Sequence, residues 1–195
     1  LCIDSANPAA LEAALSIYPG KALVNSVTGE DDKLEKVLPL IARYKAAVVC
    51  LCIGPEGIPA SAQGRLDVAK KIAARARSYG IPTDDLVVDC LCLACSTDAA
   101  SVRTTLDAMR MVRAELGCNL TLGVSNVSFG LPERMKLNVA MLTMALANGV
   151  TCPIVDPTIP EVRQAIMASD VLLGRDEWAM SWIAAARAAK AAQQQ

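Results

Sequence analysis

Short runs of apolar residues alternate along the chain with longer segments in which apolar residues recur at helical spacing. The short runs cover residues 1–3, 22–24, 46–53, 86–88, 120–127 and 152–155, and each is bounded by Gly, Pro, Asn or Asp. They lack the polar alternation of a strand with one solvated face, so they are typical of parallel strands covered on both faces. The pattern predicts six β/α units.

Two of the segments between these runs have a clear apolar helix face. The first face is formed by Leu34, Val37, Leu38 and Ile41, and the second by Val68, Ile72, Ala76 and Tyr79. Gly80 follows the second face and is typical of a helix end. Asn7 and Pro8 predict a helix start with an asparagine cap and a proline in the first turn, and the Pro-Glu pairs at 132–133 and 160–161 predict two further starts.

Six β/α units fit either an open doubly wound sheet or part of an eight-stranded β/α (TIM) barrel. Polar residues recur where the predicted strands end, and they are Asp4, Asn25, Asp89, Asn126 and Asp156. In an open sheet only the residues beside the switch point would meet, whereas around a barrel mouth all of them converge. We therefore predict an α/β fold of the TIM-barrel type.

A complete barrel has eight strands and about 250 residues. This chain has 195 residues, does not begin with methionine, and starts inside a predicted strand. We therefore expect a fragment in which the first two β/α units are missing. The expected division is an N-terminally truncated barrel domain over residues 1–175, followed by a C-terminal helix and a tail or linker over residues 176–195.

Composition and charge exclude several classes of partner. The chain is 53% hydrophobic and only 3% aromatic, and its formal net charge is -1. It therefore has no polycationic surface for a phosphate backbone, and nucleic acid is not an expected partner. The longest apolar run has eight residues, from 46 to 53, where a helix across a bilayer needs about twenty. We expect a cytoplasmic protein without a membrane partner.

The chain has eight cysteines and no histidine. Most of the cysteines lie in Val/Leu runs, where a thiol behaves as a small buried hydrophobe. Cys92 and Cys95 form a Cys-x-x-Cys pair, but no second pair has matching spacing. We therefore expect the thiols to fill the core and predict no metal site. The lack of histidine also excludes Ser-His-Asp and Cys-His catalysis.

The polar residues at the strand ends are carboxylates and amides, with no Lys or Arg among them. Any one of them could simply cap the next helix or make a turn. As a set around one mouth, they favour a neutral ligand rich in N–H donors over a phosphate. A pterin ring is such a ligand, because its 2-amino group and the adjacent ring N–H form a donor pair for one carboxylate. Hydrogen bonds to a charged partner contribute about 1.5–3 kcal/mol each, so a few suffice to orient the ring.

Four segments resemble the pterin-binding barrel family: residues 1–5, 24–26, 87–89 and, above all, 122–134. That family includes dihydropteroate synthases, the folate module of cobalamin-dependent methionine synthase and the methyltetrahydrofolate:corrinoid methyltransferases. The Gly-Val-Ser-Asn-Val-Ser sequence at 123–128 resembles the methyltransferase branch.

The resemblance implies a role for each matching residue. Asp4, Asn25 and Asp89 are expected to hold the pterin, together with Gly123 and Ser125 of the motif. Asn126 is expected to contact the ring nitrogen N5, which carries the methyl group. An amide does not titrate, so Asn126 would act as a fixed hydrogen-bond donor and not as the proton source.

The implied activity is transfer of the N5-methyl group of methyltetrahydrofolate to the cob(I)alamin, or corrinoid, of a partner domain or protein. A second copy of the chain, in a homodimer, is a further partner left open. Two alternatives remain. A dihydropteroate synthase would need a basic residue in the 125–128 segment and an Arg-x-His type motif near 154–157, and the chain has neither. A non-catalytic pterin- or folate-binding fragment is the other alternative.

Overall fold

Six parallel strands form a single sheet in which the spatial order of the strands equals their order along the chain. The computed structural model describes residues 1–192, and the tail expected at 193–195 lies outside the described residues. The strands are β1 (Cys2–Asp4), β2 (Leu23–Thr28), β3 (Ala47–Leu51), β4 (Leu86–Asp89), β5 (Asn119–Gly123) and β6 (Cys152–Ile154). All six overlap the runs predicted from the sequence. Two strand ends differ, because β2 continues past Asn25 to Thr28, and β5 ends at Gly123 where the predicted run continued to Val127.

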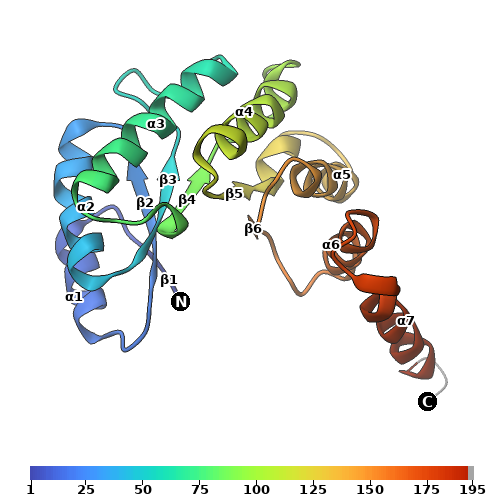
Figure 1. Cartoon of the computed structure of the whole chain (residues 1–195). Coiled ribbons are helices and arrows are strands. Elements are labelled where there is room, and N and C mark those ends of the chain that lie inside the picture. Colours follow the sequence, from blue (N-terminus) through green and yellow to red (C-terminus); the bar gives the residue numbers. More distant parts are fainter. Residues whose placement is uncertain (193–195) are drawn as a thin grey trace.

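The strand order decides between the two architectures predicted from the sequence. A doubly wound sheet reverses its order at a switch point, whereas this sheet proceeds in one direction from β1 to β6. Figure 1 shows the strands along an arc, with the helices on the outer side and an opening between β1 and β6. The chain is therefore part of a β/α barrel, as predicted.

The two edges of the sheet curve toward one another. Cys2 lies in β1 and Cys152 in β6, at opposite edges. Burial, followed by the nearby Asp4 and the Cys152 thiol, raises the pKa of Cys2. Figure 1 shows this curvature as an arc.

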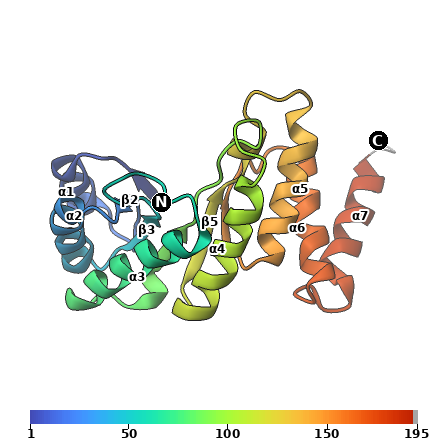
Figure 2. The ribbon, with the colours of Figure 1, turned by 90° about the horizontal axis from the view of Figure 1, so that it is seen from above.

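The helices that connect the strands cover the outer face of the arc (Figure 2). They are α1 (Pro8–Ile17), α2 (Asp31–Tyr44), α3 (Ala62–Ser78), α4 (Ser101–Leu116), α5 (Arg134–Ala147) and α6 (Pro160–Leu172), with α7 (Met180–Ala192) after them. Short 3-10 turns cover Thr83–Asp85, Val124–Ser128 and Glu177–Ala179. The helices thus cover one face of each strand, and the other face lines the inside of the arc, which in a complete barrel is filled by strand side chains.

The predicted helix ends are mostly confirmed. The Asn7 side chain accepts a hydrogen bond from the Ala9 N–H at 3.0 Å, with Pro8 in the first turn. Gly80 has a φ of +76°, in the left-handed region that favours glycine just past a helix. The start predicted at 132–133 is confirmed to within one residue, because Glu133 is the N-cap, with a left-handed φ of 51°, and α5 begins at Arg134.

The core consists of aliphatic residues, alanine and cysteine packed between the strands and the helices. The predicted α2 face, Leu34, Val37, Leu38 and Ile41, is buried. Five thiols are buried, namely those of Cys50, Cys52, Cys90, Cys92 and Cys118, whereas Cys2 and Cys152 are exposed. Core filling is therefore the role of most cysteines, as predicted. Within residues 1–192, no cluster of three potential ligands could hold a metal ion.

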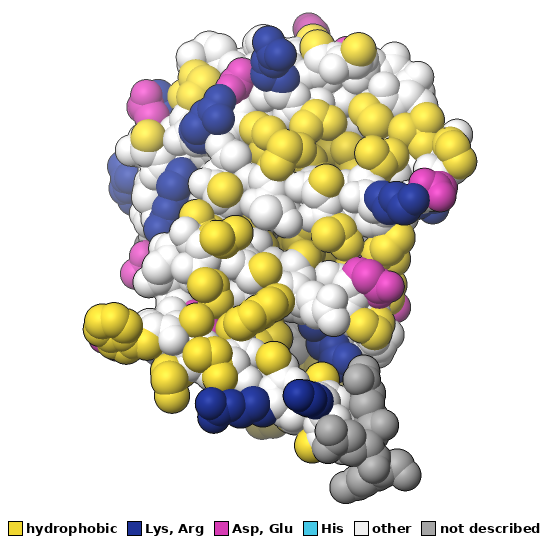
Figure 3. Space-filling view, turned by 90° about the vertical axis from the view of Figure 1, so that its right-hand side faces the viewer, with side chains coloured by type: hydrophobic (Ala, Val, Ile, Leu, Met, Phe, Trp, Pro, Cys, Tyr) yellow, Lys and Arg dark blue, Asp and Glu magenta, His cyan; other side chains and the backbone are white. Residues whose placement is uncertain are grey.

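Helix α7 extends away from the arc at the end of the described chain (Figure 2). It carries exposed apolar side chains, and the Trp178 side chain just before it is 84% exposed. Apolar side chains are frequent on this side of the molecule in Figure 3. The domain boundary at residue 175 stays a prediction. None of the helices described over residues 1–192 is both long and apolar enough to cross a bilayer.

Candidate functional site

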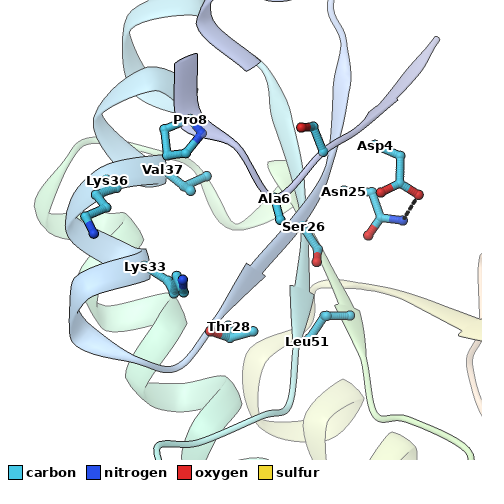
Figure 4. A pocket seen from close by; sticks show the side chains of 11 residues that line it. Asp4, Ala6, Pro8, Asn25, Ser26, Thr28, Lys33, Lys36, Val37 and Leu51 are labelled. Atoms are coloured by element: carbon cyan, nitrogen blue, oxygen red, sulfur yellow. Dashed lines mark hydrogen bonds between the residues drawn. The ribbon is translucent and has the colours of Figure 1, made fainter. Parts of the chain in front are cut away.

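Asp4 ends β1, and Asn25 lies beside it within β2, three residues before that strand ends at Thr28. They are register partners in the β1–β2 ladder, and Asn25 Nδ2 donates a hydrogen bond of 3.1 Å to Asp4 Oδ2. The β2–β3 ladder shifts its register between Asn25 and Val27, which marks an irregularity just after Asn25. Figure 4 shows the two side chains pointing toward one another. The parallel register therefore brings together an acid and an amide that are 21 positions apart.

A cavity of about 340 Å³ opens beside this pair. Its wall includes Asp4 from β1, Asn25 from β2, and Lys33 and Lys36 from α2. In Figure 4 the two lysines lie on the α2 side of the strands, away from the Asp4–Asn25 contact. The strand ends themselves carry no basic residue, as the sequence indicated, but the first turns of α2 bring two ammonium groups to the same cavity.

Asp89 ends β4 and is almost completely buried, with 6% of its surface exposed. Its Oδ1 accepts a hydrogen bond of 2.7 Å from the Leu91 N–H. Burial raises the pKa of Asp89 to about 6, although the Leu91 N–H, the charge of Arg65 and the Gly123 N–H each oppose that rise. Near neutral pH this carboxylate is charged, poorly hydrated and able to accept N–H donors from a ligand.

Gly123 and Asn126 lie at the end of the adjacent strand, where β5 passes into the turn Val124–Ser128. Asn126 is exposed, and its amide folds back over Gly123. A Cβ added to Gly123 would lie 3.2 Å from Asn126 Nδ2, a tight contact. Glycine at 123 therefore leaves room for the Asn126 amide next to the Asp89 strand end.

The turn that carries Asn126 is held from both sides. Arg134 donates from Nη2 to the Ser125 carbonyl at 2.9 Å and from Nε to Ser128 Oγ at 3.0 Å. From the loop after β4, the Cys95 N–H donates to the Val127 carbonyl at 3.0 Å. The loops that follow Asp89 and Gly123 are thus connected directly. This connection fixes Asp89 and Asn126 relative to one another.

The structure brings the predicted site residues together in two groups. One group is the pair Asp4 and Asn25, and the other is Asp89, Gly123, Ser125 and Asn126. Strand β3 lies between them, and its last residue, Leu51, pairs with both Thr28 and Asp89. Leu51 also lines the cavity beside Asp4, but Asp89 and Asn126 do not. The groups share one end of the curved sheet, and their joint action on one ligand stays a prediction.

Asp156 has a local role instead. Its Oδ1 accepts hydrogen bonds from the Thr158 N–H at 2.8 Å and the Thr158 hydroxyl at 2.6 Å. These contacts lower the pKa of Asp156, with the hydroxyl contributing most. The residue makes the turn before α6, which is the ordinary role of an aspartate after a strand.

Asp89→Asn is expected to stabilise the ligand-free protein at pH 7 by about 2 kcal/mol. A rise of the pKa from 3.8 to about 6 corresponds to about 3 kcal/mol, and asparagine loses part of it by placing an NH2 group near Gly123. Because the folded-state pKa is the higher one, the destabilisation is present above pH 6 and disappears as the pH falls toward 3.8. The free energy of unfolding, measured in urea at pH 7 and near pH 3.8 for both proteins, checks this. A variant no more stable than wild type at pH 7 would contradict it.

Comparisons with known proteins identify relatives of this chain. Residues 1–156 match the family model described as "Pterin binding enzyme". The chain is 30% identical to the methylcorrinoid:tetrahydrofolate methyltransferase of Eubacterium limosum, over 97% of the chain and 71% of that protein. It is also 30% identical to the methionine synthases of Mycobacterium leprae and Mycobacterium tuberculosis, over 80% of the chain but only 14% of each of those proteins.

Solved structures show the same fold. A Yersinia pestis dihydropteroate synthase with a pterin–sulfa conjugate aligns with a TM-score of 0.67 at 15% identity, covering 89% of this chain and 68% of that one. A second structure of the Yersinia pestis enzyme aligns with a TM-score of 0.62 at 13% identity, over 89% of this chain and 82% of that one. At such identities the likeness establishes the barrel architecture alone.

Proposed function

The chain belongs to the pterin-binding enzyme family, and we propose that it catalyses methyl exchange between N5 of a tetrahydrofolate and a corrinoid. In the direction expected from the sequence, methyltetrahydrofolate gives its methyl group to cob(I)alamin. The relative from Eubacterium limosum is named for the opposite direction, and a catalyst accelerates both. The observation that carries the proposal is the Asp89–Gly123–Asn126 group, a buried carboxylate beside an exposed amide on adjacent strand ends.

The buried Asp89 fits the donor pair of a pterin. Its carboxylate has little contact with water, so N–H donors of a ligand replace solvation that folding has removed. Asp4 and Asn25, on β1 and β2, supply both acceptors and an NH2 group. We assign these three side chains to binding and orienting the ring, together with Gly123 and Ser125.

Asn126 is assigned to N5. Methyl transfer leaves negative charge on N5 unless a proton or a hydrogen bond compensates it, and the Asn126 NH2 group is a donor that cannot be deprotonated near neutral pH. Arg134 and Cys95 hold the backbone of the turn that carries Asn126, so the position from which the amide projects is fixed before the reaction. Its contribution is electrostatic and geometric, and the proton reaches N5 from water or a carboxyl group.

The corrinoid, bound to a partner domain or protein, supplies the cobalt that accepts or gives the methyl group. The residues of this chain hold the folate with N5 at the end of the sheet, where Asn126 is exposed. The exposed position of Asn126 fits a reaction in which a separate domain or protein brings the corrinoid to N5. We therefore propose a corrinoid-binding domain or protein as the partner, and a second copy of the chain as a further one.

The test is methyl transfer from methyltetrahydrofolate to free cob(I)alamin. The reaction is monitored by the loss of cob(I)alamin absorbance, and unmethylated tetrahydrofolate is the control. Transfer above the uncatalysed rate supports the proposal. Binding of methyltetrahydrofolate without transfer would indicate a folate-binding protein. Condensation of a dihydropterin pyrophosphate with aminobenzoate would indicate a dihydropteroate synthase.

Arg134→Met is expected to lower the rate of methyl transfer about tenfold while changing the affinity for methyltetrahydrofolate little. The guanidinium donates to Ser125 and Ser128 on either side of Asn126, so its loss loosens the donor at N5 without touching Asp4 or Asp89. The rate constant and the Kd are measured separately. Arg134→Lys should not restore the rate, because an ammonium cannot reproduce a planar pair of donors. An unchanged rate for Arg134→Met would contradict this role.

A further inference from the structure

Arg65 is the largest of the fully buried side chains and has 1% of its surface exposed. It lies in the first turn of α3, on the same helix face as the buried Ala69, Ile72 and Ala76. All the hydrogen bonds described for its guanidinium go to neutral oxygens. They are the carbonyls of Pro59 at 3.0 Å, Cys90 at 2.9 Å and Leu91 at 2.7 Å, and Thr105 Oγ1 at 3.0 Å. Burying a cation is costly, and this one is hydrogen-bonded only to neutral oxygens, so we look for a role of Arg65 beyond packing.

The carbonyls that Arg65 binds belong to the segment directly after Asp89. Leu91 takes a φ of +60°, in the left-handed region that a leucine rarely adopts. One face of this residue serves Asp89, because the Leu91 N–H donates to Asp89 Oδ1 at 2.7 Å. The other end is held from outside, because the Leu91 carbonyl accepts from Arg65 Nη1 and from Thr105 Oγ1. Arg65 of α3 and Thr105 of α4 thus fix the backbone conformation in which the Leu91 N–H binds the Asp89 carboxylate.

We propose that Arg65 is a positioning residue, which locks the backbone of Cys90 and Leu91 so that the Asp89 carboxylate stays fixed and negatively charged for the N–H donors of a ligand. The identity of that ligand as a pterin rests on the proposed function, whereas the effect of Arg65 on Asp89 does not. The same guanidinium reaches the Pro59 carbonyl in the loop after β3, so it connects two neighbouring loops at the candidate site.

Arginine suits this position better than any other residue. Its planar guanidinium has five N–H donors and no acceptor, so one side chain can satisfy carbonyls of two loops at once. It also remains charged at every relevant pH. Arg65 is one of the groups that lower the pKa of Asp89 against the effect of burial. A neutral donor could replace some of the hydrogen bonds but not this effect of charge.

The other ionisable groups facing Asp89 are thiols. Contact with the Cys52 thiol, then burial and the charge of Asp89, raises the pKa of Cys90. Burial, followed by the charge of Asp89, raises the pKa of Cys92 to about 11. Both thiols therefore stay neutral where Asp89 titrates. On the side of β5, Gly123 and Thr121 are uncharged, and on α4 Thr105 is uncharged, which leaves Arg65 as the charged group that acts on this carboxylate.

The test follows the titration of Asp89 by ¹³C NMR of its carboxyl carbon in the ligand-free protein. Arg65→Met is expected to raise the pH midpoint of Asp89 by about one unit, because it removes the cation and loosens the Leu91 N–H. Arg65→Lys keeps the charge and is expected to leave the midpoint closer to that of wild type. That rise lowers the charged fraction of Asp89 at pH 7 from about 0.9 to about 0.5, so the affinity for methyltetrahydrofolate at pH 7 should fall at least about twofold for Arg65→Met.

Arg113→Met is the matched control. Arg113 also donates to two backbone carbonyls, those of Gly117 and Cys118, but it does so at the opposite end of the strands. It should leave the Asp89 midpoint unchanged. A wild-type midpoint in folded Arg65→Met, or an equal shift in Arg113→Met, overturns the proposal.

A second variant and a second measurement cover the cases in which Arg65→Met does not fold or the wild-type protein does not bind the ligand. If Arg65→Met does not fold, Thr105→Val removes the hydroxyl that contacts both Arg65 and the Leu91 carbonyl, and it should raise the midpoint by a smaller amount. No rise in that variant overturns the proposal as well. If the wild-type protein does not bind methyltetrahydrofolate, the proposed function fails, and the NMR titration still decides whether Arg65 positions Asp89.

Discussion

Asp89→Asn is expected to weaken the binding of methyltetrahydrofolate by at least about a hundredfold. The carboxylate is buried and charged above pH 6, so its bonds to the N–H donors of the ring are of the charge-assisted kind, worth about 1.5–3 kcal/mol each. Asparagine replaces one acceptor oxygen by an NH2 group that faces a donor of the ligand. Calorimetric titration near neutral pH measures the loss.

Asp156→Asn is the matched control for this experiment. Asp156 also follows a strand, but its carboxylate is engaged by the N–H and hydroxyl of Thr158. It should leave the affinity close to that of wild type. Because Asp89→Asn is expected to be more stable than wild type in the absence of ligand, a loss of binding cannot be attributed to unfolding. Wild-type affinity in Asp89→Asn would remove the central residue from the proposed site.

Asp89→Asn is thus expected to raise the stability of the ligand-free protein and to lower its affinity for the ligand. Burial of Asp89 opposes folding when the carboxylate is charged, and the same burial makes the carboxylate a strong acceptor for a ligand. Folding alone would favour a neutral residue at position 89. An acidic residue that is held there by the Leu91 N–H and by Arg65 is therefore explained by binding and not by stability.

The architecture could be predicted from the sequence because the relevant signals are local. Apolar runs without polar alternation indicated six strands, and all six are present in the expected order. The asparagine cap at Asn7 and the stop at Gly80 depend on neighbouring residues only, and both are confirmed. The start of α5 was predicted to within one residue, but the left-handed conformation of Glu133 could not be predicted from the Pro-Glu pair.

The strand-end residues could be predicted because parallel strands end at a common edge. Their division into two groups could not, since it depends on the curvature of the sheet and on Leu51 between them. Lys33 and Lys36 were missed because they reach the cavity from a helix and not from a strand end. Arg65 carried a signal, a charged residue on the face of Ala69 and Ile72, but its partners are backbone carbonyls about 25 residues away that no sequence pattern reveals.

Asn126→Ala is expected to reduce the rate of methyl transfer by about a hundredfold to a thousandfold, with a change in Kd below about tenfold. The reason is that a fixed donor acts mainly where charge develops, at N5 as the methyl group leaves, whereas the ring is held by Asp4, Asn25 and Asp89. Single-turnover transfer to cob(I)alamin, with the Kd measured separately, distinguishes the two effects.

Gly123→Ala tests the same donor without altering it. The new Cβ would lie 3.2 Å from Asn126 Nδ2, so the amide must move, and the rate should fall in the same direction but by less. Asn148→Ala is the matched control, because Asn148 is a partly exposed asparagine just after α5 that contacts Arg110 and the Met144 carbonyl. It should transfer at the wild-type rate. If Asn126→Ala transfers as fast as Asn148→Ala, the donor at N5 is not Asn126, and the turn after β5 serves binding only.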